Sequence, residues 1–173
     1  QELDLTSTLV IDSELSRLKG LTGLHTLNLS GTEVTDDGLV NLKGLANLQM
    51  LTLSATSVSD PGLVHLRELE NLRSLHLNST GVTDAGLEHL TVLTNLEELY
   101  LTSNLTVGNA GLVHLQELKK LRILGLKGTT VSDSGLGHLS KLKSLQTLYI
   151  SGAGVSVAGA KALKKKLRKC KIQ

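Results

Sequence analysis

A phrase of 24 residues repeats along the chain, and this period constrains the fold more strongly than any single residue does. The copies follow one another without a gap at residues 21–44, 45–68, 69–92, 93–117, 118–141 and 142–165, and the fourth copy has one extra residue. Residues 1–20 match the last part of the phrase and are read as a partial N-terminal repeat. A fixed period of this length is typical of a stacked array in which each unit contacts only its neighbours. We therefore expect one elongated domain, residues 1–173.

Each copy contains one segment that alternates between apolar and polar residues. Leu27 and Leu29 flank a polar residue, and the same pattern returns in the later copies. A period of two predicts a short strand with one buried face, and stacking makes the strands parallel at a spacing of ~4.8 Å. The next segment is predicted to be a short helix, with Leu63 and Leu66 facing inward.

Predicted helix caps and glycines recur at fixed positions of the repeat, and one copy has an insertion. Asp60 precedes the only proline and is predicted to be a helix N-cap. The same role is predicted for Asp36, Asp84, Asn109 and Asp133. Glycines recur in the first turn of each predicted helix, which indicates that adjacent coils approach too closely for a Cβ there; they are Gly38, Gly62, Gly86, Gly111, Gly135 and Gly159. The extra residue lies between Asn104 and Asn109, where we expect Gly108 to absorb it as a bulge.

The phrase reads LxxLxxLxLSGTxVTDxGLxxLxx and resembles the leucine-rich repeat family over essentially the whole chain. Its GTxVTDxGLxxL part is similar to a bacterial, planctomycete-type variant. The resemblance implies an α/β fold, namely a curved, right-handed solenoid with a parallel β-sheet on its concave face, short helices on its convex face, and partner binding on the concave side. The ending ALKKKLRKCKI is similar to the end of such arrays, so residues 160–173 are predicted to form a basic C-terminal cap in which Cys170 is buried and begins a closing strand.

One turn position departs from the family pattern. It carries Thr32, Thr56, Thr80 and Thr129, where the family usually has Asn, and only Asn104 keeps the amide. A hydroxyl both donates and accepts, so we expect a shorter hydroxyl ladder along the loops.

The sequence contains no recognisable catalytic constellation. GxSxG and HExxH are absent, and the single cysteine has no histidine partner in a known motif. Histidines recur at one helix position, where they would form a line and not the converging geometry of a metal site; they are His65, His89, His114 and His138. We therefore predict a protein that is not an enzyme and has no cofactor or metal.

Charge is distributed very unevenly. Residues 1–117 contain 5 Lys or Arg and 15 Asp or Glu, whereas residues 118–173 contain 13 Lys or Arg and 1 acid. In a stacked array this asymmetry makes one acidic end and one basic end. Solvated caps explain it, and so do an electrostatically steered partner and head-to-tail self-association. The basic tail lacks the interleaved aromatics of nucleic-acid binders. No apolar run reaches membrane-spanning length, and this leaves the compartment open.

The polar positions of the predicted strands form columns on one face of the sheet. The central column contains both tyrosines, and Gly125 between them is expected to leave a notch. Tyr is well suited to anchor an interface. The predicted partner-binding residues are Met50, His76, Asn78, Glu98, Tyr100, Ile123, Lys127 and Tyr149. We interpret the chain as a non-catalytic module that binds a protein partner. The alternatives are a structural, self-associating scaffold with oppositely charged ends and a targeting domain of a larger protein.

Overall fold

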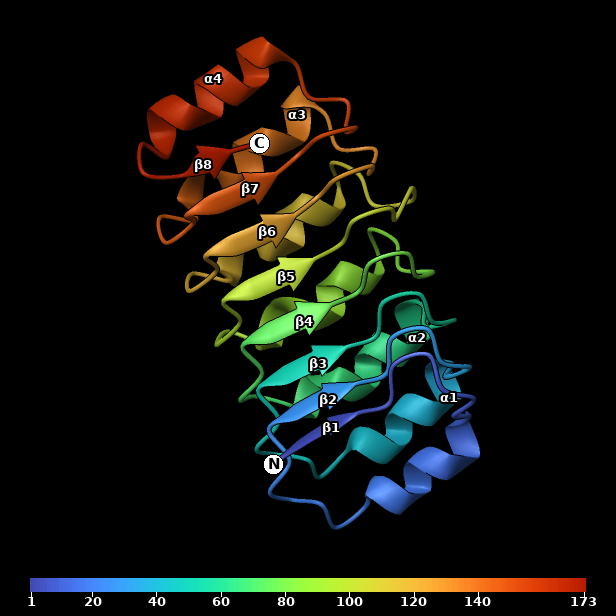
Figure 1. Cartoon of the computed structure of the whole chain (residues 1–173). Helices are drawn as coiled ribbons and strands as arrows, with labels where there is room; N and C mark the ends of the chain where they lie inside the picture. Colours follow the sequence, from blue (N-terminus) through green and yellow to red (C-terminus); the bar gives the residue numbers. More distant parts are fainter.

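Each copy of the repeat folds into one coil, and the coils stack in chain order with strands along one side and short helices along the other (Figure 1). The computed structural model describes residues 1–173. The eight strands form one sheet in the order β1 to β8, and every neighbouring pair is parallel. The strands are β1 (Glu2–Asp4), β2 (Thr26–Asn28), β3 (Met50–Thr52), β4 (Ser74–His76), β5 (Glu98–Tyr100), β6 (Ile123–Gly125), β7 (Thr147–Tyr149) and β8 (Lys171–Ile172). The predicted parallel sheet with short helices is confirmed.

The strands pair so that equivalent residues of successive copies lie side by side. Leu27 pairs with Leu51 and Leu51 with Leu75, each 24 residues further along the chain. The extra residue of the fourth copy changes the step to 25 between Leu99 and Leu124, and the register is kept. The insertion is therefore taken up outside the sheet.

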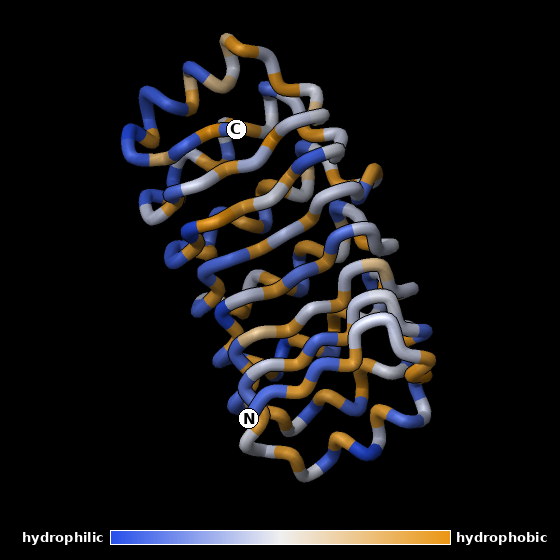
Figure 2. The backbone as a smooth tube through the Cα atoms, in the orientation of Figure 1, coloured by the Kyte–Doolittle hydropathy of each residue, from blue (hydrophilic) through white to orange (hydrophobic).

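The core is one continuous column of leucines. All 42 buried apolar residues form a single cluster that runs through the stack. Figure 2 shows apolar and polar residues alternating along each coil, so that every coil contributes to this core. Because each coil buries its leucines against the next, no single coil has a core of its own.

The helices are short, as predicted, and much of their length is 3-10 helix. In three copies the helix begins with a single α-turn and continues as a 3-10 helix, three others have 3-10 helix alone, and the last copy has a ten-residue α-helix. A 3-10 helix rises ~2.0 Å per residue, so it spans the back of a coil with few residues. The helices are α1 (Asp36–Leu39), α2 (Asp60–Leu63), α3 (Asp133–Leu136), α4 (Val157–Lys166), η1 (Asp12–Leu18), η2 (Val40–Leu42), η3 (Val64–Glu68), η4 (Gly86–Val92), η5 (Gly111–Glu117) and η6 (Gly137–Lys141).

The aspartates at the helix starts link adjacent coils instead of capping their own helices. Ser59 is the N-cap of α2, and Asp60 is the first helical residue. The Asp60 carboxylate accepts from the backbone N–H of Thr83 at 2.8 Å and from its hydroxyl at 2.6 Å, one coil further on. Equivalent contacts join Asp36 to Ser59, Asn109 to Ser132 and Asp133 to Ser156. The predicted capping role is therefore wrong: the backbone of the next coil lies within reach of these side chains.

The threonines of the turn position close their own turns and do not form a ladder. The hydroxyl of Thr32 donates to the Leu29 carbonyl at 2.7 Å, three residues earlier in the same coil. Asn104 bridges two coils, since its amide donates to the carbonyls of Leu77 at 2.7 Å and Leu101 at 3.0 Å. The expected hydroxyl ladder is wrong because these hydroxyls donate within their own coil, and only Thr80 also contacts the next coil, where its hydroxyl lies 3.0 Å from Asn104 Oδ1.

The extra residue is absorbed at Leu105 and not at Gly108. The N–H of Val107 donates to the Asn104 carbonyl at 3.1 Å and closes a turn around Leu105, whose side chain is 72% exposed. Gly108 keeps a regular place, and its N–H donates to Asp84 at 2.6 Å. The insertion therefore forms a small exposed turn beside the strand side of the coil.

The basic end of the stack is closed by α4 and β8. Leu163, Leu167 and Cys170 are buried, whereas the lysines between them are exposed. Burial raises the pKa of the Cys170 thiol, with an opposing effect from Lys164. None of the helices has the length and apolar character needed to cross a bilayer.

Gly111 provides a test of the close approach between coils, and Gly137 is its matched control. A Cβ at Gly111 would lie 2.5 Å from Oδ1 and 3.1 Å from the Cα of Asp84, and the latter atom belongs to the backbone. Gly111→Ala should lower the free energy of unfolding by about 1–3 kcal/mol. Gly137 has open space around its Cα, so Gly137→Ala should raise that free energy by about 0.5–1 kcal/mol. Urea denaturation measures both, and a Gly111→Ala variant as stable as the parent would contradict the close approach.

Candidate functional site

The register brings the predicted binding residues onto one face of the sheet. His76 pairs with Tyr100, Tyr100 with Gly125, and Gly125 with Tyr149. The central leucine of each of these strands is fully buried, so its two neighbours leave the sheet on the opposite, open side. Met50, Glu98 and Ile123 line the column on one side of the tyrosines, and Asn78 and Lys127 line the column on the other. We call this surface the sheet face.

His76 and Tyr100 form a packed aromatic pair. Their ring centroids are 4.4 Å apart and their planes are tilted by 51°. The buried Ser74 hydroxyl lies 3.2 Å from His76 Nε2 and donates to Glu98 at 3.2 Å. These contacts hold both rings in place, so the pair presents a preformed surface.

Burial controls the protonation of this pair. Burial lowers the pKa of His76, and the Glu98 carboxylate partly opposes this effect. Burial also raises the pKa of Tyr100, and Glu98 adds to the increase. The imidazole is consequently neutral at neutral pH, and the phenol keeps its proton.

The ring of Tyr149 contacts a cation, and the ring of Tyr100 packs over a glycine. The Lys127 ammonium lies 5.0 Å from the centroid of the Tyr149 ring, which is a cation–π contact. A Cβ at Gly125 would lie 3.0 Å from Tyr100 Cδ1, so the ring already occupies the space above this glycine. The predicted notch between the tyrosines is therefore wrong: Tyr100 leans across Gly125 and fills it.

Asn78 is partly engaged within the loops. Its side-chain oxygen accepts from the Thr102 N–H at 2.9 Å, and its amide donates to Ser54 at 3.2 Å. Asn78 therefore fixes the loop beside the aromatic pair, and it has less freedom to contact a partner than the rings do.

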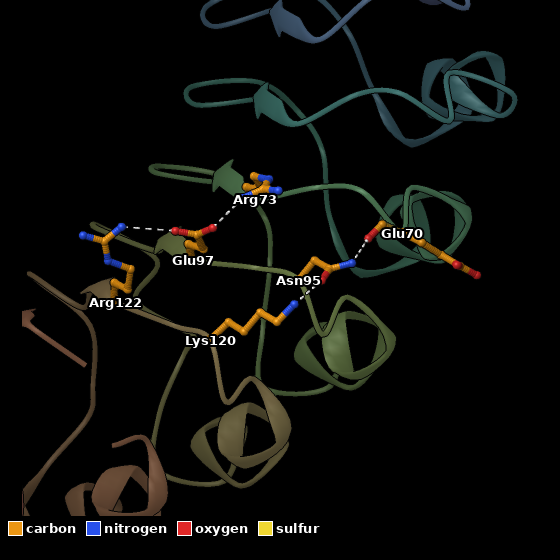
Figure 3. A network of polar contacts seen from close by, with 6 residues as sticks. All are labelled: Glu70, Arg73, Asn95, Glu97, Lys120 and Arg122. Atoms are coloured by element: carbon orange, nitrogen blue, oxygen red, sulfur yellow. Dashed lines mark hydrogen bonds and ion pairs between the residues drawn. The ribbon is translucent and has the colours of Figure 1, made fainter. Parts of the chain in front are cut away.

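An ionic network at the start of the strands was not foreseen from the sequence. The Glu97 carboxylate accepts from Arg73 at 2.9 Å and from Arg122 at 3.3 Å (Figure 3). Arg122 also donates to Gln146 at 3.3 Å. Hydrogen bonding from Arg122, and then from Arg73, lowers the pKa of Glu97. The signal in the sequence is a column one residue before the strands that stays polar from Gln49 to Gln146.

Two cavities meet at this network and share Glu97. The first has a volume of about 290 Å³ and borders the sheet face; it is lined by Thr26, Gln49, Met50, Arg73, Ser74, Glu97 and Glu98. The second has a volume of about 440 Å³ and lies toward the basic end; it is lined by Glu97, Lys120, Arg122, Lys143, Ser144, Leu145, Gln146 and Lys169. The sheet face thus continues at its edge into a second, more cationic recess.

The recurring histidines lie on the helix side and are half-buried. Gln116 contacts Nδ1 of His138 at 3.3 Å, whereas Nδ1 of His65 is buried without a hydrogen-bond partner. No group of three or more His, Cys, Asp or Glu residues is arranged to hold a metal ion.

Comparisons with known proteins identify the repeat. A family model described as "Leucine Rich repeat" matches residues 21–43 and 68–90. An internalin C2 from Listeria monocytogenes superposes with a TM-score of 0.77 at 26% identity, over 99% of this chain and 70% of that chain. The chain is a leucine-rich repeat protein. The planctomycete-type form of the repeat stays a prediction.

Two further solved structures share the leucine-rich repeat fold. A leucine-rich repeat protein from Leptospira interrogans has a TM-score of 0.70 at 23% identity, over 100% of this chain and 48% of that chain. An internalin from Listeria monocytogenes has a TM-score of 0.55 at 20% identity, over 99% of this chain and 59% of that chain. No curated protein matches the sequence significantly. The leucine-rich repeat chain therefore spans about half to two thirds of the length of some of its structural relatives, and its fold is one commonly used for protein interaction.

The protonation of His76 can be measured directly. Its pKa should lie below 6.5 because burial disfavours the imidazolium ion. Glu98→Gln removes the negative charge that favours this ion, so the midpoint should fall further. An NMR titration of the His76 ring resonances in both proteins provides the measurement. A midpoint that rises in the Glu98→Gln variant would contradict the described geometry.

Proposed function

We propose that this leucine-rich repeat protein is a non-catalytic recognition module whose sheet face binds a protein partner through Tyr100 and Tyr149. The observation that carries the proposal is the fixed arrangement of both tyrosines on an open sheet whose other central positions are mostly small and polar. Tyr combines a large apolar ring with a hydroxyl, and it is enriched at the energetic centres of interfaces.

Preorganisation supports this role for the tyrosines. The Tyr100 ring packs against His76 and over Gly125, and the Lys127 ammonium lies over the Tyr149 ring. A side chain that is already ordered loses less conformational freedom on binding, and this loss otherwise costs about 0.5–1.5 kcal/mol per side chain.

The residues around the tyrosines supply both apolar area and charge. Met50 is 38% exposed although it is apolar, and Ile123 lies in the column beside Tyr100. Glu98 and Lys127 place opposite charges on the two sides of the central column. Paired charges of this kind orient a partner and reject incorrectly charged ones.

The double variant Tyr100→Ala/Tyr149→Ala tests the proposal. Partners captured from the source organism by the parent protein are quantified by mass spectrometry, and the affinity of a purified partner is then measured by calorimetry. The double variant should bind that partner about 100-fold or more weakly, because hot-spot residues contribute at least ~2 kcal/mol each.

Val64→Ala/Val113→Ala is the matched control on the helix side. Both valines are exposed, at 42% and 44%, so this variant also removes apolar surface. It should bind within about twofold of the parent. Loss of binding in the valine variant with the tyrosine variant unaffected would reject the sheet face as the binding surface.

Charge-driven self-association is a second candidate, and the opposite charges of the two halves favour it. Sedimentation velocity at about 20 mM and about 500 mM salt separates the two candidates, because the screening length falls severalfold over this range. A recognition module should sediment as one species of constant mass at both salt concentrations. Oligomers that form only at low salt would support the scaffold instead.

A further inference from the structure

The basic residues of the C-terminal half converge on one recess at the edge of the sheet. This is the cavity of about 440 Å³ that shares Glu97 with the cavity bordering the sheet face. Four cationic side chains line it, namely Lys120, Arg122, Lys143 and Lys169. Its volume falls within the range of about 300–1,000 Å³ that is usual for ligand-binding sites. We call it the basic recess.

Three of these cations have no carboxylate partner. Lys120, Lys143 and Lys169 take part in none of the five ion pairs of the protein. Lys120 donates to the Asn95 side chain at 2.7 Å, and Lys143 donates weakly to a backbone carbonyl at 3.4 Å. Positive charges that lie together without carboxylates make the local electrostatic potential more positive, so an anion that enters the recess is stabilised.

The cationic lining continues around the end of the stack. A third cavity, of about 240 Å³, shares Lys143, Leu145 and Lys169 with the basic recess and adds Lys166 and Arg168. The basic recess is therefore the inner end of a longer cationic groove, which suits an extended chain carrying several negative charges.

Glu97 shows which anionic group fits this surface. Its carboxylate lies between Arg73 and Arg122, at 2.9 Å and 3.3 Å (Figure 3). After Arg122, the next position in the same column is Gln146, a neutral side chain with Lys143 and Lys169 lining the recess beside it. Glu97 is thus a carboxylate between two arginines, whereas the neutral Gln146 provides no carboxylate for Lys143 and Lys169.

We propose that the basic recess binds an acidic segment of the protein partner whose body lies on the sheet face. This inference rests on the proposed function, since it assigns a second contact to the same partner. Residues with carboxylates would pair with Lys143, Lys169 and Lys120. No aromatic side chain lines the recess to stack with bases, and its one apolar residue, Leu145, is buried and cannot enter a bilayer.

Octaglutamate labelled with fluorescein is the probe, and fluorescence anisotropy at about 100 mM salt measures its affinity. Lys143→Gln/Lys169→Gln should weaken binding by about tenfold or more, because it removes two of the four positive charges that line the recess. Lys161→Gln/Lys165→Gln removes the same charge from exposed positions of α4 that do not line the recess. This control should bind within about twofold of the parent. Circular dichroism confirms that both variants are folded.

Several results would overturn the inference. They are the absence of octaglutamate binding, an equal loss of affinity in the Lys143→Gln/Lys169→Gln variant and in the control, and tighter binding of an oligothymidine or of phosphatidylserine vesicles at the same salt concentration.

Experiments with the purified partner distinguish failure of this inference from failure of the proposed function. Octaglutamate binding in the recess together with an unaffected Tyr100→Ala/Tyr149→Ala variant would reject the tyrosine face alone. Partner binding lost in the tyrosine variant but insensitive to Lys143→Gln/Lys169→Gln would reject the acidic segment alone.

Discussion

Register between successive coils is the constraint on which the rest of the structure depends. A parallel sheet places equivalent residues ~4.8 Å apart, so whatever one copy presents, the next copy presents beside it. Leucines at these positions seal one core, as Leu51 does between Leu27 and Leu75. Even the copy with an extra residue keeps the pairing of Leu99 with Leu124 and places the surplus in an exposed turn. Loss of register would expose every leucine column at once.

The polar contacts between coils follow from the same register. Aspartates such as Asp60 bind the backbone of the next coil, and asparagines such as Asn71 donate to a carbonyl of the previous coil at 2.8 Å. Coils that are so closely spaced leave no room for a Cβ at positions such as Gly111. The repeat therefore conserves its own backbone geometry from copy to copy, and its exposed strand positions are free to differ.

That freedom allows the copies to differ on the sheet face and its edge. The central column changes from small polar residues to His76, Tyr100 and Tyr149, while the leucines beneath it stay the same. The edge column changes likewise, and Glu97 joins the two regions because it lines both cavities. Substitutions there alter recognition chemistry without disturbing the core, which is the physical reason that one scaffold can present an aromatic surface next to a cationic groove.

The sequence by itself determined the period, the parallel register, the leucine core and the grouping of both tyrosines in one column, because these follow from spacing alone. The resemblance of its ending to the end of other arrays indicated the closing strand, which begins at Lys171, one residue later than predicted. Only the tertiary structure decided which side chains meet across coils. The carboxylate of Asp60 reaches the next coil instead of its own helix, Tyr100 fills the space above Gly125, and Glu97 gathers two arginines. Such contacts depend on the rotation and distance between neighbouring coils to within a fraction of an ångström, and a repeat period does not fix either quantity that finely.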